Sequence, residues 1–402
     1  MSATPPPLPL SYFPAGQGWS SPPPSTSRER VWDVLRGFGI LGIFSLHVFL
    51  FSTDYETFFL TDYDRSTDWP WILVSALGNG KFITILAMTF GAGVAMIAAK
   101  RSARGLGVRW NMARRSAVLL ALGLTHYTLL FFGDILQFYA IAGLIALTFV
   151  TARDRTLMHV AVWCPLASLM VGTGFGLLLP LMAAFAPGEL AEAFEGTGAE
   201  YAAYATGGYA DQIGYRAETW IYNFSYMIVE IPFIVGLFAL GMLVWRRGWL
   251  AAPSAHPALV GRALWVCLTV GVVVNVLTAI PTSFEWVVAT TYPQRYLGGA
   301  SLGIAVAILL AMGVERGVFK PALKLLSNVG ERALTCYLFQ SLLGAIIFYS
   351  WGLGWYGQLT NVQLLGVLAV VWTLTVLLAA ALAAMKMRGP AEWLWRKLAP
   401  TS

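Results

Sequence analysis

The residues in this sequence whose types suit chemistry are ionisable side chains inside apolar runs. The run from Arg30 to Ser52 is long enough to cross a bilayer, yet it contains Asp33, Arg36 and His47. On a helix that turns about 100° per residue, Arg36 and His47 fall within about 20° of one face, and Asp33 shares that side. Ionisable groups inside a membrane are costly and usually face the interior of a bundle. The stripe therefore predicts a polar site. The structural alternative is an interfacial anchor followed by a histidine that hydrogen-bonds between packed helices.

Three further titratable side chains are predicted in the same half of the membrane as His47. His126 lies in a later span, Asp134 begins the span after it, and Lys81 follows a Gly-Asn-Gly interruption at 78–80. Non-helical backbone at membrane depth is tolerated only inside protein or beside a water-filled cavity. These groups predict a polar cavity between helices. The structural alternatives are a Lys81 that reaches outward to water and a His126 that bonds a carbonyl or Asp134.

The composition is that of an integral membrane protein. Hydrophobic residues make up 57% of the chain and charged residues 11%, against about 25% charged in soluble domains. The mean hydropathy is +0.67. The net charge is +6, and the basic residues lie in short loops between apolar runs. This pattern argues against nucleic acid as a partner and indicates that the protein lies in a lipid bilayer. The three cysteines have no metal-ligand or disulfide spacing and are interpreted as packing residues.

The loop charges predict the topology. The fold class is all-α, a polytopic bundle of about ten transmembrane helices, predicted at 34–53, 70–99, 113–132, 134–151, 156–186, 221–245, 260–281, 289–314, 328–350 and 363–385. Basic loops follow the even-numbered spans and acidic loops the odd-numbered ones, so the positive-inside rule puts both termini in the cytoplasm. Residues 1–27, rich in Pro and Ser, are predicted to be disordered. Residues 28–402 form a single transmembrane helical domain.

Several stretches together resemble a known family. They are DVLRGFGILGI from Asp33, GNGKFITILAMTFGAG at 78–93, the run at 114–144, GERALTCYLFQ from Gly330, and GPAEWLWRKL at 389–398. In this order they resemble the YeiB-type family of bacterial integral membrane proteins. The match extends over nearly everything after residue 28.

That family resembles a wider group of transmembrane acyltransferases, which includes the acyltransferase-3 proteins and heparan-glucosaminide N-acetyltransferase. Their shared signature is an Arg followed, after ten residues, by His or Asn, and here it is matched by Arg36 and His47. YeiB-type sequences usually carry Asn at the second position, so His47 departs toward the acyltransferase-3 pattern. The resemblance implies a multi-pass protein of the bacterial cytoplasmic membrane. It would pass an acyl group, with acetyl-CoA as co-substrate, to a hydroxyl or amine of a glycan or small metabolite.

The resemblance also implies roles for individual residues. His47 or His126 would act as general base, because a neutral imidazole suits that task, and Asp134 would orient His126. Arg36 and Lys81 would hold the acyl-CoA or stabilise the oxyanion. Arg114 and Arg115 would contact the CoA phosphates. The remaining substrate-binding candidates are Asp33, Tyr337 and Gln340.

A second class of function stays open. Glu230 lies at mid-depth in the predicted sixth span. With Lys81 and the histidines it would suit the proton path of a proton-coupled transporter or flippase. A third hypothesis is an accessory membrane protein without turnover. The sequence leaves assembly into a homo-oligomer undecided.

Overall fold

The computed structural model describes residues 25–53, 69–185, 198–225, 227–278 and 284–400. The predicted disordered segment 1–27 lies outside the described residues except for its last three. All regular structure in the described part is helical, as predicted. The helices are α1 Ser25–Ser52, α3 Trp69–Gly78, α4 Lys81–Ser102, α5 Arg109–Leu129, α6 Leu136–Ala146, α7 Asp154–Phe185, α9 Gly198–Tyr201, η2 Ala202–Thr206, α10 Tyr209–Ser225, α11 Met227–Arg247, η3 Pro253–Ala255, α12 Pro257–Leu277, α13 Phe284–Pro293, η4 Gln294–Gly299, α14 Ala300–Arg316, α15 Lys320–Glu331, α16 Ala333–Phe348, α17 Asn361–Ala384 and α18 Pro390–Leu398.

Each of the ten predicted spans contains a helix, but the helices differ in length. Within the described residues, the stretches long and apolar enough to cross a membrane are Arg30–Ser52, Trp69–Ser102, Asp154–Met182, Met227–Arg247, Pro257–Leu277, Ala289–Arg316 and Asn361–Ala384. The other three predicted spans correspond to α5, α6 and α16. The chain is therefore a helical membrane protein with seven such stretches, and ten crossings stay a prediction.

The sixth and ninth predicted spans each merge separate helices. The sixth, predicted at 221–245, joined the end of α10 to most of α11. The ninth, predicted at 328–350, crosses the end of α15. There Arg332 leaves the helical conformation, and its guanidinium donates to the carbonyl oxygens of Met387 and Asn328. Arg332 thus ends one helix before α16 begins.

Helix α1 is the centre of the half of the bundle that carries the site. It packs against α4, α15, α16 and α17. Its contact with α15 is a close backbone approach: a Cβ on Gly37 would overlap the Leu326 carbonyl, and a Cβ on Gly330 would overlap the Asp33 carbonyl. Small residues of this kind let membrane helices approach closely. The two glycines therefore fix the position of the charged part of α1.

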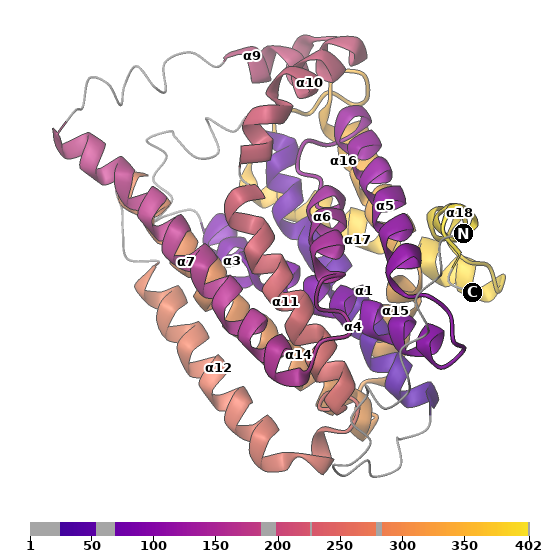
Figure 1. Cartoon of the computed structure of the whole chain (residues 1–402). Helices are drawn as coiled ribbons and strands as arrows, with labels where there is room; N and C mark the ends of the chain where they lie inside the picture. The colour runs from indigo at the N-terminus through magenta and orange to yellow at the C-terminus, as the bar shows by residue number, and fades with distance from the viewer. Residues whose placement is uncertain (1–24, 54–68, 186–197, 226, 279–283, 401–402) are drawn as a thin grey trace, which may run out of the picture.

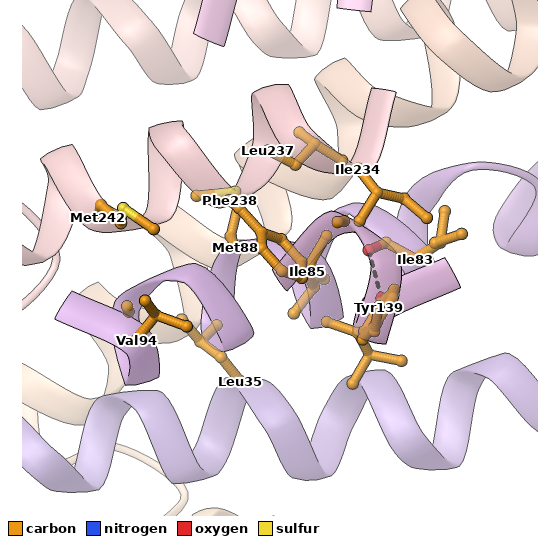
Figure 2. Close-up of a cluster of buried hydrophobic side chains, with 14 of the residues drawn as sticks. Leu35, Ile83, Ile85, Met88, Val94, Tyr139, Ile234, Leu237, Phe238 and Met242 are labelled. Atoms are coloured by element: carbon orange, nitrogen blue, oxygen red, sulfur yellow. Dashed lines mark hydrogen bonds between the residues drawn. The ribbon is translucent and has the colours of Figure 1, made fainter. Parts of the chain in front are cut away.

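The other half of the bundle is organised around α11, which packs against α4, α6 and α7. Figure 2 shows Phe238 and Met242 of α11 meeting Met88 of α4, while Tyr139 of α6 donates to the Ile83 carbonyl at 3.2 Å. Figure 1 shows α9 and α10 capping one end of the bundle, α7 and α12 along one side, and α18 beside α5 on the other side. The outer helices α7 and α12 expose large apolar side chains such as Trp163 and Trp265, as expected of helices that face lipid.

Candidate functional site

A cavity of about 400 Å³ lies among α1, α4, α5, α6, α16 and α18. Its apolar wall comes mainly from α4 and α6 and includes Leu86, Phe90 and Tyr139. Its charged lining is Asp33, Arg36, Lys100, Arg115, Glu331, Glu392 and Arg396. Binding sites for small molecules are commonly of this size and combine an apolar wall with a few polar groups.

The acidic residues of the cavity are engaged within the protein. Asp33 pairs with Arg36 at 3.0 Å. Glu331 pairs with Arg332 at 3.2 Å. Glu392 accepts a hydrogen bond from the Leu334 backbone N–H at 2.7 Å. The cavity therefore presents basic groups to a ligand more readily than acidic ones.

The basic end of the cavity is formed by Arg115 and α18. The Arg115 guanidinium donates to the Ala399 carbonyl at 2.9 Å and lies 4.3 Å from the ring centre of Trp395. The Trp395 indole N–H donates back to the Arg115 carbonyl at 3.2 Å. Arg114, predicted to act beside Arg115, is exposed and does not line the cavity.

Tyr337, which is 1% exposed, also lines the cavity. Its ring centre lies 5.1 Å from that of His126 and 6.1 Å from that of His47. Its hydroxyl oxygen accepts from the Ile135 backbone N–H at 3.3 Å. Neither histidine lines the cavity. Tyr337 is therefore the side chain that touches both the cavity and the buried histidines.

His126 and Asp134 form a buried pair. The His126 Nδ1 atom lies 2.8 Å from Asp134 Oδ1, and the second carboxylate oxygen accepts from the Gln137 backbone N–H at 2.9 Å. A Cβ on Gly123 would come within 2.8 Å of that carboxylate, so glycine leaves the space it occupies. An ionised Asp134 accepts the Nδ1 proton, which leaves the lone pair on Nε2. The Nε2 atom is buried and has no hydrogen-bond partner among the described residues.

His47 and Arg36 both face the α15–α16 segment. The Arg36 guanidinium donates to the Gly330 carbonyl at 3.3 Å. The His47 ring, 5% exposed, packs 4.9 Å from Phe131 and makes no hydrogen bond to another described residue. Gln340, one turn after Tyr337 on α16, is buried, and its amide has no partner in the described part of the chain.

Lys81 lies outside the cavity. Its ammonium group is buried rather than directed to water and donates to the Asn275 side-chain oxygen of α12 at 3.3 Å. Glu230 lies in a separate cluster, where one carboxylate oxygen accepts from Arg295 at 2.5 Å and from the Tyr296 hydroxyl at 2.9 Å. These residues do not line the cavity.

Sequence reasoning did not assign Lys100, Trp395 and Arg396 to a site. The GPAEWLWRKL stretch was a usable signal, but its basic residues also fit a topology role. Among the described residues no group of His, Cys, Asp and Glu is arranged to hold a metal ion.

The fold and the site define a class: a helical membrane protein whose cavity is lined by basic residues and is next to two buried histidines, His47 and His126. Residues 244–401 match a family described as "Protein of unknown function (DUF418)". The chain is 28% identical over 394 residues to "Uncharacterized protein YeiB" of Escherichia coli (strain K12), covering 92% of this chain and 96% of that protein. It is 25% identical over 405 residues to "Uncharacterized protein YxaH" of Bacillus subtilis (strain 168), covering 94% and 96%. These matches support the resemblance of the chain to the YeiB-type family.

Proposed function

We propose that this protein is a membrane-embedded acyltransferase that moves an acyl group, acetyl in the simplest case, from acyl-CoA to a hydroxyl or amine of a glycan or small metabolite. The observation that carries the proposal is Tyr337. One side chain lines the basic cavity and packs against both His126 and His47. A donor bound in the cavity would thus be one side chain away from a candidate general base.

The cavity suits the chemistry of the donor. Arg115 and Lys100 line it at the ends of the basic loop between α4 and α5, which the positive-inside rule assigns to the cytoplasm. The phosphates of CoA would bind there, and the pantetheine arm would lie along the apolar wall of α4 and α6. From Arg36 to His47 the rise along α1 is about 16 Å at 1.5 Å per residue, which is comparable to the extended length of that arm.

His126 is the better placed base. Its Nδ1 proton bonds Asp134 at 2.8 Å, and its Nε2 atom has no partner among the described residues. In the proposed reaction Nε2 takes the proton from the acceptor O–H or N–H. The acceptor atom bonds to the thioester carbonyl carbon, and the C–S bond breaks. The thiolate leaves and receives the proton from the imidazolium, so His126 is restored. Asp134 stabilises the imidazolium in between.

His47 and Arg36 have distinct parts in this proposal. Arg36 lines the cavity, where its guanidinium would bind the pantetheine amides or the thioester oxygen. His47 packs on Tyr337 and Phe131 and would bind the acceptor, with Gln340 as a second polar contact. Lys81 and Arg114, which do not line the cavity, take no part.

The test is acetyl-CoA turnover by the purified protein, measured as release of free CoA thiol. His126→Ala is expected to lower the rate by about 10²-fold or more, and His47→Ala to raise the KM for an acceptor. His159, exposed on α7, provides the control His159→Ala, which should behave as wild type. Turnover that survives His126→Ala unchanged would rule out this residue as the base. A folded wild-type protein that neither binds nor cleaves acetyl-CoA would overturn the acyltransferase proposal.

Proton-coupled transport is the second candidate function, and a specific contact favours it. The break before α4 packs against the π-helix η4: the Asn79 amide donates to the Gln294 side chain at 2.7 Å, next to the Glu230–Arg295 ion pair. π-Helical turns and broken helices are frequent at functional sites in membrane proteins. The test is proton movement into proteoliposomes that contain the protein. If the protein is a transporter, the wild type should move protons and Glu230→Gln should abolish this movement. A wild-type protein that moves no protons would overturn this candidate function.

A further inference from the structure

The C-terminal stretch 389–398 folds as α18 and is attached to the start of α16 by Glu392. One carboxylate oxygen accepts from the backbone N–H groups of Leu334 at 2.7 Å and Thr335 at 3.1 Å, and the other accepts from the Thr335 hydroxyl at 2.5 Å. A Cβ on Gly389 would overlap this carboxylate and the Thr335 hydroxyl, so glycine is required there. The Glu392 carboxylate is therefore engaged by hydrogen bonds to α16 and does not pair with the basic residues of α18.

A second attachment joins α18 to α5. The Trp395 ring lies against the Arg115 guanidinium, and the indole N–H donates to the Arg115 carbonyl. The chain after α18 adds two more bonds, in which the Ala399 carbonyl accepts from Arg115 at 2.9 Å and the Pro400 carbonyl accepts from the Asn111 side chain at 2.5 Å. Arg115 is therefore held in place by α18, and its remaining N–H groups can meet a ligand.

The two faces of α18 differ. Glu392, Trp395 and Arg396 line the cavity. They are spaced three and four residues apart and so share one face. The exposed residues that do not line the cavity are Trp393, Leu394, Lys397 and Leu398. Helix α18 thus has a cavity face and an outer face.

Arg396 and Arg115 bring like charges to the lining of the cavity. Arg396 makes no hydrogen bond or ion pair with another described residue, since Glu392 is engaged by α16. Burial and then the nearby Arg388 lower the pKa of the Arg396 guanidinium, while Glu392 opposes that shift. Two guanidinium groups on one cavity wall, with the acidic groups engaged elsewhere, form a site for an anion of more than one charge. Planar guanidinium groups fit phosphate by paired hydrogen bonds.

We propose that α18 is a ligand-binding element: Arg396 on α18 and Arg115 on α5 together bind the phosphate groups of the nucleotide end of the acyl donor. The inference rests on the proposed function for the identity of the donor. It adds that the C-terminal helix supplies one of the binding groups and orients the other. An occupied site would link α5, α16 and α18 through the ligand.

The experiment measures binding of CoA, adenosine 3′,5′-bisphosphate and pantetheine to the purified full-length protein in detergent. Arg396→Ala should weaken CoA and the bisphosphate by about tenfold or more, because charged hydrogen bonds contribute more than neutral ones. Arg396→Lys should recover part of the loss. Pantetheine, which has no phosphate, should bind equally to all variants.

The matched control is Lys397→Ala, which removes the same charge from the adjacent residue on the outer face of α18. Equal CoA affinity of Arg396→Ala and Lys397→Ala would overturn the inference and leave the acyltransferase proposal standing. Phosphate-dependent binding through Arg396 without any acetyl-CoA turnover would support the site and contradict the proposed function. No binding by the folded wild-type protein would overturn both.

Discussion

The Nδ1 atom of His126 and the Oδ1 atom of Asp134 lie 2.8 Å apart, and both side chains are buried. Asp134 also holds the start of α6 through the Gln137 backbone N–H. His126 and Asp134 are thus attached to two helices, α5 and α6, that are joined by a short turn. A change in the turn would cost the hydrogen bonds from Asp134 to His126 and to the Gln137 backbone.

The first prediction concerns this pair. Asp134→Asn replaces an acceptor by an amide that can donate to Nδ1, which favours the tautomer with the proton on Nε2. We expect kcat for acetyl-CoA turnover to fall by about 10²-fold or more, with little change in the KM for acetyl-CoA. The control is Asp154→Asn on α7, where the carboxylate pairs with Arg246 and Arg247. A kcat for Asp134→Asn equal to that of the control would show that Asp134 does not act on the base.

The second prediction concerns Tyr337 as the barrier between the cavity and the histidines. Tyr337→Phe keeps the ring and loses only the hydroxyl that accepts from Ile135. Tyr337→Ala removes the ring that packs on both histidines. We expect the alanine variant to hydrolyse acetyl-CoA faster in the absence of acceptor, because water gains access to the base, and the phenylalanine variant to resemble wild type. Slower hydrolysis in a folded alanine variant would contradict the barrier role.

The sequence made the helices and part of the site predictable. Apolar runs identify the spans, and helical periodicity predicts Arg36 and His47 on one side of α1, where their side chains contact α15 and α16. The His126–Asp134 contact is also predictable from the sequence, because the partners are only eight positions apart, across a tight turn.

Long-range contacts were not predictable in the same way. Lys81 meets Asn275 of α12, and Arg115 meets Ala399, and these partners are 194 and 284 positions apart in the sequence. Periodicity gives the face of a helix but not the helix that it meets. Arg396 lines the cavity only because α18 packs against α5 and α16. The pattern of a single sequence does not show which helices α18 contacts.

The third prediction concerns the contact between α1 and α15. Gly330→Val places a branched side chain against the Asp33 carbonyl of α1. Overpacking of this kind costs about 1–3 kcal/mol or more, and the displaced helix would also move the Asp33–Arg36 pair. We expect a lower melting temperature in detergent and weaker CoA binding. Gly366→Val on α17, where a Cβ meets nothing within 4 Å, is the control and should melt close to wild type.

The last prediction concerns topology. In a variant without Cys164, Cys267 and Cys336, single cysteines replace two exposed alanines, Ala103 after α4 and Ala210 in α10. The positive-inside rule assigns the first to the cytoplasm and the second to the opposite side. We expect a membrane-impermeant maleimide to label Ala210→Cys in intact cells and Ala103→Cys only after lysis. The reverse labelling would put the basic loop between α4 and α5 outside the cell, where acyl-CoA is not supplied, and would contradict the assignment of donor and acceptor sides.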